Sequence, residues 1–214
     1  PPAVALISLG CAKNTVDSEC ILGNLISAGL LVAEDPADAD ICLVNTCGFI
    51  DDARAEAAGV LNELAELKKH GRPRVVVALG WLVERIADCP ELDSFLKNAD
   101  ARIGFKDYSR LPEICANLLK PHAGRPAPGI PSAHPALPQS FMSFLNSPRA
   151  RIGNVHSEFV NVAEGCSNVC RFCSIPRIRG LQVSRPIEDV LVEAGQLVRS
   201  GAREINLIAQ DTSN

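Results

Sequence analysis

Three apolar runs, each followed by a turn and an amphipathic segment, constrain the fold of this chain most strongly. They cover residues 4–9, 41–45 and 74–79. A near-continuous apolar run is typical of a strand in a parallel sheet that is covered on both faces. We therefore expect three parallel strands in the first half of the chain, with a smaller unit at residues 103–105.

The segments between these runs repeat apolar residues at helical spacing. Four helices are expected, beginning near Ser18, Asp51, Leu82 and residue 111. The first has Asp17 or Ser18 as its N-cap and Gly29 as its stop. Strands that alternate with helices in this way predict an α/β fold with a parallel sheet.

Two cysteines and a tryptophan come directly after successive strands of this predicted sheet. Cys11, Cys47 and Trp81 each occupy the first turn after a strand. The carboxyl ends of parallel strands meet at one edge, where open α/β sheets bind ligands. Two thiols that converge there suggest a metal site.

The composition changes between residues 121 and about 148, where proline, glycine, alanine, histidine and serine predominate. Little regular structure is expected in such a segment, so we predict a linker over residues 121–154. It divides the chain into domains at residues 1–120 and 155–214. We interpret His122 and His134 as solvent-facing linker residues.

The second domain reads as one strand–helix–strand unit. Predicted strands at residues 159–163 and 204–209 flank a helix that opens at Ser184-Arg185-Pro186 and stops at Gly201. The expected buried face of that helix consists of Ile187, Val190, Leu191, Ala194, Leu197 and Val198. This is the first unit of a partial TIM-like barrel, and we expect it to expose a sheet edge and an apolar face.

Three cysteines follow the first strand of that unit. Cys166, Cys170 and Cys173 are separated by three and then two residues. Thiolates are the usual protein ligands of iron–sulfur clusters, so a loop of this kind can hold three irons of a 4Fe–4S cubane and leave the fourth open. Structural zinc is the alternative, but it needs a fourth ligand, and His156 lies ten residues upstream.

At residues 166–173 the chain resembles the radical S-adenosylmethionine superfamily, whose signature is this cysteine spacing. The resemblance implies that the open iron chelates S-adenosylmethionine, which is cleaved reductively to a radical. Glu164, Arg177, Arg179 and Arg185 are candidates for contact with that cofactor, with ordinary surface or ion-pair roles as the alternative.

Residues 8–19 and 45–50 are similar to the N-terminal domain of methylthiotransferases. That family holds an auxiliary 4Fe–4S cluster with three cysteines, of which Cys11 and Cys47 match two. Trp81 stands at the place of the third and cannot ligate iron. Cys89 is expected to lie too far from position 81 to replace it, and Cys20, Cys42 and Cys115 read as buried apolar residues.

Residues 8–14, 163–166 and 209–212 are similar to the branch of the family that modifies ribosomal protein uS12 on the β-carbon of an aspartate. The resemblance implies uS12 or the small ribosomal subunit as partner, a flavodoxin-like electron donor, and further barrel and C-terminal segments in the complete enzyme. Two alternatives stay open: a non-catalytic or partly inactive iron–sulfur fragment, favoured by Trp81, and a tRNA methylthiotransferase.

The net charge, the cysteine content and the apolar runs limit the kinds of function and the cellular location that we expect for this chain. The formal net charge of −4 gives no indication of nucleic-acid binding. Nine cysteines without a signal-peptide pattern indicate the reducing cytoplasm and metal or redox roles. The longest apolar run, residues 75–83, is too short for a membrane span.

Overall fold

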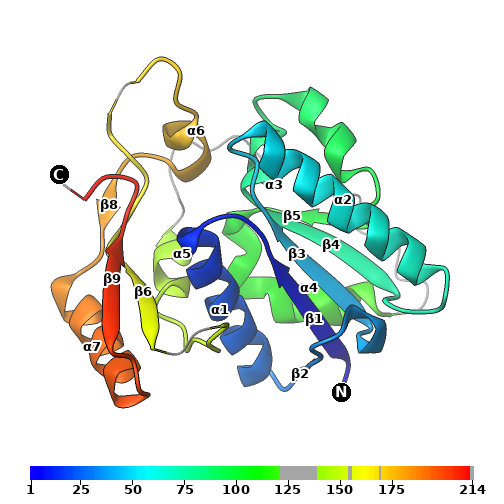
Figure 1. The fold of residues 1–214 in the computed structure, drawn as a ribbon, viewed down its shortest axis with the longest axis horizontal. Coiled ribbons are helices and arrows are strands. Elements are labelled where there is room, and N and C mark those ends of the chain that lie inside the picture. The colour runs from blue at the N-terminus through cyan, green and yellow to red at the C-terminus, as the bar shows by residue number, and fades with distance from the viewer. Residues whose placement is uncertain (121–138, 154–155, 169, 213–214) are drawn as a thin grey trace.

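The computed structural model describes residues 1–120, 139–153, 156–168 and 170–212 (Figure 1). Its first half is built on a parallel sheet with the strand order β2-β1-β3-β4-β5. The strands are β1 (Ala3–Ser8), β2 (Leu31–Val32), β3 (Ile41–Thr46), β4 (Val75–Gly80) and β5 (Ala101–Ile103). The predicted α/β fold is thereby confirmed.

Helices connect these strands on both faces of the sheet (Figure 1). They are α1 (Ala12–Ser27), α2 (Asp51–Lys68), α3 (Trp81–Arg85) and α4 (Leu111–Leu118), with short 3₁₀ turns at Pro36–Asp38, Pro90–Leu96 and Phe105–Arg110. The prediction that the first helix begins near Ser18 is wrong, because α1 already begins at Ala12. Asp17 and Ser18 therefore lie inside the helix, where both are fully buried.

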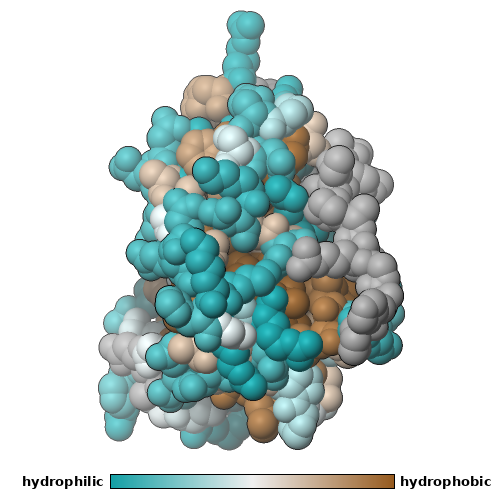
Figure 2. Space-filling view, turned by 90° about the vertical axis from the view of Figure 1, so that its right-hand side faces the viewer, coloured by the Kyte–Doolittle hydropathy of each residue, from teal (hydrophilic) through white to brown (hydrophobic). Residues whose placement is uncertain are grey.

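The alternation of side chains along the strands produces two apolar cores. On one face, Val4, Leu43 and Val77 pack with α1 and α4. On the other, Ala5, Val44 and Val76 pack with α2 and α3. The end of this domain turned to the viewer in Figure 2 is mostly hydrophilic, and its largest apolar area lies in the lower half of the view.

The segment predicted as a linker contains a helix, α5 (Gln139–Phe144). The expectation of little regular structure is therefore wrong for this part, while residues 121–138, with His122 and His134, lie outside the described residues. Phe141 and Phe144 are almost fully buried and pack on Phe105 and Tyr108 of the first core. Phe141 and Phe144 are three residues apart, which is helical spacing, but a single such pair in a proline-rich segment is a weak signal for a helix. Their burial depends on contacts with Phe105 and Tyr108, which are distant in sequence.

The second half contains the predicted strand–helix–strand unit. Strand β6 (Ser157–Asn161) pairs in parallel with β9 (Glu204–Ile208), and α7 (Ile187–Arg199) connects them. A small antiparallel pair, β7 (Ala163–Glu164) with β8 (Val183–Ser184), flanks the cysteine loop, and α6 (Ile175–Arg179) follows that loop. The first strand begins two residues before the predicted position.

The predicted buried face of α7 is wrong in part. Leu197 is buried and Val190 packs beside it, but Ile187, Leu191 and Val198 are 67%, 64% and 55% exposed. In the part of the chain that the structure describes, α7 rests on the narrow β6-β9 pair, which covers one stripe of the helix. Leu191 and Val198 directly follow the inward-facing Val190 and Leu197, so about 100° of rotation carries each of them off that stripe. Ile187 is the first residue of the helix.

Candidate functional site

The carboxyl ends of β1, β3 and β4 surround a cavity of about 760 Å³. The chain leaves β1 toward one face of the sheet and leaves β3 toward the other, so this edge is the topological switch point of the fold, where such sheets bind ligands. Cys11, Cys47 and Trp81 all line the cavity, together with Ile175 and Gln210 of the second half. The structure therefore brings the three strand-end residues to one place.

Two glycines allow these turns to pack closely. Gly10 has φ +92°, and a Cβ on it would lie 2.6 Å from Cβ of Cys47. Gly80 also has φ +92°, and its added Cβ would lie 2.4 Å from Oδ1 of Asn45. A side chain at either position would combine backbone strain with a clash. The glycines thus set how closely the strand ends approach.

Buried polar side chains brace the same edge. Asn14 donates its Nδ2 to the carbonyl oxygens of Leu9 (2.8 Å) and Thr46 (3.1 Å). Asn45 donates to Oγ of Ser18 (2.9 Å), which in turn contacts Oγ of Ser8 at 2.8 Å. These bonds satisfy backbone groups at strand ends and fix β1 against β3. The sequence alone did not indicate this network, although Ser8 and Asn45, as polar residues at the ends of apolar strands, were a usable signal.

The two thiols of the cavity differ in exposure. Cys11 is exposed at the N-terminus of α1, and Cys47 is half-buried. Burial raises the pKa of the Cys47 thiol above its ordinary value, and charge on Cys11 or Glu56 would raise it further, against a lowering by the Phe49 backbone N–H. Both thiols line the same cavity.

Trp81 fills the third strand end. Its side chain is 5% exposed, its ring contacts Phe49 edge to face at 6.5 Å, and the guanidinium carbon of Arg179 lies 5.0 Å from its ring centre. Its Nε1 is buried and has no hydrogen-bond partner among the described residues. The indole is therefore held by packing and by a cation–π contact.

The cysteine loop lines a second cavity, of about 450 Å³. Cys166 is buried, Cys173 is half-buried and Cys170 is exposed. The backbone N–H of Cys166 donates to the carbonyl oxygen of Gly180 at 3.1 Å, and the N–H of Cys173 donates to that of Cys170 at 3.1 Å. Asn168 Nδ2 lies 3.4 Å from the Cys166 sulfur.

The sulfur chemistry of this loop fits an iron–sulfur cluster, because three thiols face one cavity. Within the described residues, no three Cys, His, Asp or Glu side chains converge closely enough to hold a metal ion as the loop stands. Binding of a cluster would therefore require the three thiols to move closer together. Cys89, which the sequence-based analysis considered for position 81, lines this loop cavity instead.

The structure does not place Glu164, Arg179 or Arg185 beside the loop cavity, where cofactor contact was expected. Glu164 and Arg179 are fully buried between the two halves of the chain, paired with each other at 3.3 Å. Lys13 of α1 joins them through Glu164 at 3.0 Å. Of the four candidates, Arg177 lines the loop cavity.

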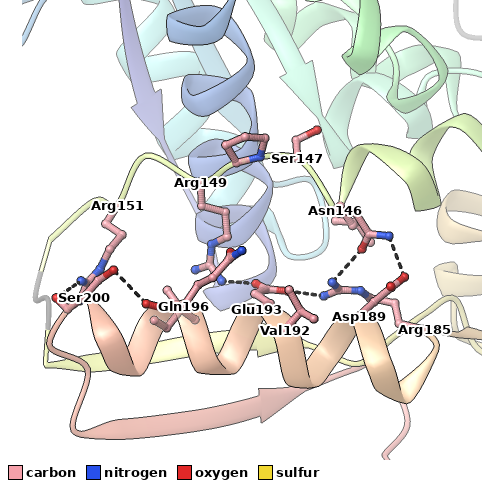
Figure 3. A pocket seen from close by; sticks show the side chains of 13 residues that line it. Asn146, Ser147, Arg149, Arg151, Arg185, Asp189, Val192, Glu193, Gln196 and Ser200 are labelled. Atoms are coloured by element: carbon pink, nitrogen blue, oxygen red, sulfur yellow. Dashed lines mark hydrogen bonds and ion pairs between the residues drawn. The ribbon is translucent and has the colours of Figure 1, made fainter.

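Arg185 belongs to a different contact, shown in Figure 3. Arg149 and Arg185 both donate to the carboxylate of Glu193 on α7, each at 2.5 Å, and Asn146 accepts from Arg185 at 2.8 Å. The surrounding hollow of about 420 Å³ lies between α7 and the segment that follows α5. Because its charged side chains pair with one another, we interpret it as a structural joint between the halves.

Cys20, Cys42 and Cys115 are buried, as predicted. Burial raises the pKa of Cys42 and of Cys115 to about 12 and raises that of Cys20 as well. Thiols of this kind behave as small apolar side chains.

None of the helices in the described part of the chain has the length and apolarity of a membrane span.

Comparison with known proteins relates both halves to one group. Residues 3–103 match the model of the uncharacterized protein family UPF0004. Curated relatives named "Ribosomal protein uS12 methylthiotransferase RimO" include those of Anaeromyxobacter sp. (strain Fw109-5), 38% identical over 97% of this chain, and Desulfosudis oleivorans, 41% identical over 98%. The chain spans less than half the length of these relatives, 42% and 46% respectively.

Solved structures agree on the fold. The radical S-adenosylmethionine methyltransferase TsrM from Kitasatospora setae, with tryptophan substrate and a SAM analog bound, superposes with a TM-score of 0.64 at 15% identity. The match covers 99% of this chain and 48% of that one. A second structure of the same protein, with cobalamin and a [4Fe-4S] cluster bound, gives 0.62.

Proposed function

We propose that this chain, which belongs to the methylthiotransferase family of its curated relatives, acts in the radical S-adenosylmethionine-dependent methylthiolation of an aspartate of ribosomal protein uS12. Relatives that align with 97% or more of the chain carry that name. The observation that carries the proposal is the arrangement of Cys166, Cys170 and Cys173 around one cavity.

In this proposal the three loop cysteines hold a 4Fe–4S cluster and leave its fourth iron without a protein ligand. When bound, such a cluster supplies the electron for reductive cleavage of S-adenosylmethionine. A ligand can reach the loop from solvent, because Cys170 is exposed and Phe172 is 94% exposed. Gly165, at φ +73°, holds the base of the loop against the backbone of Gly180 and Leu181.

Two arginines support binding of an anionic group at the same cavity. Arg171 and Arg177 are exposed and line it beside the cysteines. A guanidinium binds a carboxylate through paired hydrogen bonds. We propose that they would bind the carboxylate of S-adenosylmethionine beside the three cysteines.

The cavity at the switch point supports a substrate position between the halves. Its walls come from the strand ends of the first half and from Ile175, Ala209 and Gln210 of the second. A peptide that carries the target aspartate would reach both halves at once there. We further propose a flavodoxin-like electron donor for the cluster, and ribosomal protein uS12 or the small ribosomal subunit as the partner.

The test is formation of 5′-deoxyadenosine by anaerobically reconstituted, dithionite-reduced protein supplied with S-adenosylmethionine. We expect Cys170→Ala to abolish product and Cys42→Ala to leave it unchanged, because Cys42 is buried in the sheet and faces neither cavity. Product that survives in Cys170→Ala would contradict the assignment of the loop. The complete enzyme is then tested for its substrate. If it forms 5′-deoxyadenosine and modifies tRNA but not uS12, the result would favour the tRNA branch.

A further inference from the structure

The cavity at the carboxyl ends of β1, β3 and β4 does not offer, among the described residues, the ligands that a second iron–sulfur cluster requires. A cubane needs at least three protein thiolates or equivalent ligands to be held at a site. Among the described residues that line this cavity, Cys11 and Cys47 supply thiols, and Trp81 occupies the third strand end. The donor set therefore does not fit a 4Fe–4S cluster.

Among the described residues, no neighbouring group takes the place of the third ligand. Asp52 and Glu56 line the cavity, but they offer carboxylates, whereas the usual protein ligand of an iron–sulfur cluster is a thiolate. Cys89 lies at the loop cavity and not at this one. Cys42 is buried within β3, four residues before Thr46 at the carboxyl end of the strand.

Trp81 also fills space. Its indole is 5% exposed and is clamped between Phe49 and the guanidinium of Arg179, which stacks in turn on Phe105 at 3.9 Å. Arg179 is fully buried and ion-paired to Asp17 and Glu164. The indole is therefore packed where the two halves meet, and its contacts hold it in the space that a cluster would need.

We propose that the N-terminal site of this chain carries no iron–sulfur cluster, and that Cys11 and Cys47 remain there as a reduced dithiol beside the Trp81 indole. The proposal rests on the proposed function for the loop cluster, which it leaves as the single cluster of the chain. The dithiol faces the cavity in which the substrate is placed, so it is open to small thiol-reactive molecules.

Iron and acid-labile sulfide are counted in protein reconstituted anaerobically with excess iron and sulfide. The native chain is expected to bind about four irons, and the triple variant C166A/C170A/C173A about none. Trp81→Cys restores the third thiol and is expected to raise the iron content about twofold. Trp81→Phe is the matched control, because it keeps an aromatic ring without a thiol, and its iron content is expected to stay at that of the native chain.

Protection from alkylation locates the cluster independently of the count. Reconstituted native protein is treated anaerobically with N-ethylmaleimide and mapped by mass spectrometry. Cys11, which is exposed, is expected to be modified, and Cys170 to be protected. In Trp81→Cys both are expected to be protected.

The outcomes separate this inference from the proposed function. About eight irons in the native chain, or about four retained in the triple loop variant, would overturn the absence of an N-terminal cluster. A folded Trp81→Cys whose iron content does not rise would overturn the assignment of that absence to Trp81. A native chain without iron would instead contradict the loop site and the proposed function with it.

Discussion

The guanidinium of Arg179 pairs with the carboxylate of Asp17, although 162 residues separate them along the chain. Both side chains are fully buried. Arg179 also pairs with Glu164 at 3.3 Å and lies 3.9 Å from the ring centre of Phe105. Removal of these charges from water is costly, so several partners at once are needed to offset it. The pair joins the helix that follows β1 to the helix that follows the cysteine loop.

Replacement of Arg179 by Met should destabilise the chain strongly. It leaves Asp17 and Glu164 as buried carboxylates, of which Glu164 keeps its ion pair with Lys13 at 3.0 Å. We expect a loss of about 3–5 kcal/mol in the free energy of unfolding, measured by urea denaturation. Arg110→Met is the control, since that side chain is 58% exposed and its ion pairs are worth about 0–1 kcal/mol. Equal losses in both variants would contradict the role of the buried pair.

Gly23 of α1 should tolerate no side chain. An added Cβ would lie 1.8 Å from the carbonyl oxygen of Pro148, because the segment after α5 crosses the helix at that point. We expect Gly23→Ala to cost at least about 1–3 kcal/mol. Gly59 of α2 has no atom within 4 Å of an added Cβ, so Gly59→Ala should stabilise by about 0.5–1 kcal/mol. Thermal unfolding of the two variants checks the opposite signs, and stabilisation by Gly23→Ala would show that the crossing does not form.

Phe141 should hold α5 to the first domain. Its ring is 1% exposed and lies 5.4 Å from the ring centre of Phe105 and 5.9 Å from that of Tyr108. Truncation to Ala leaves a cavity among these rings and should cost about 3–5 kcal/mol. Phe172→Ala, at a ring that is 94% exposed, should leave stability unchanged. If the Phe141 variant unfolds at the same urea concentration as the native chain, α5 is not docked in solution.

Glu84 should make stability depend on pH. Burial raises the pKa of its carboxyl above the ordinary value, against lowering by the Phe105 N–H, which donates to Oε1 at 2.6 Å, and by Arg179. A raised pKa in the folded state favours the protonated form, so this contribution to stability is full at low pH and is lost as pH rises through the folded pKa. Relative to Glu84→Gln, the native chain should therefore lose stability as pH rises from acidic to neutral.

The comparison is made by urea unfolding of both proteins across that pH range. The glutamine keeps an oxygen that accepts from the Phe105 N–H, so the variant isolates the charge. A stability difference that stays constant with pH would show that the carboxyl is not shifted in this direction.

The local patterns of the sequence predicted the sheet and its edge well. The apolar runs at residues 4–9 and 41–45 became central strands, and the positions of Cys11, Cys47 and Trp81 directly after strands were enough to bring them to one cavity. This works because parallel strands share one carboxyl edge regardless of the details of packing.

The buried ion pairs of Arg179 with Asp17 and Glu164, which connect the two halves, could not be predicted in the same way. Asp17 and Ser18 have the residue types of a helix cap, and local rules therefore placed the helix start there. Their burial depends on Arg179 and on Asn45, which are remote in sequence. Similarly, Arg179 and Glu164 resembled cofactor ligands because they flank the cysteine loop, whereas their partners lie on α1.

The central claim is that Cys166, Cys170 and Cys173 hold a cluster with one iron open to S-adenosylmethionine. Electron paramagnetic resonance of the anaerobically reconstituted and reduced chain tests it most directly. We predict that S-adenosylmethionine changes the spectrum of the native chain, and that Cys170→Ala shows neither the cluster signal nor the change. A signal that is identical with and without S-adenosylmethionine, or zinc bound by the three cysteines, would contradict the claim.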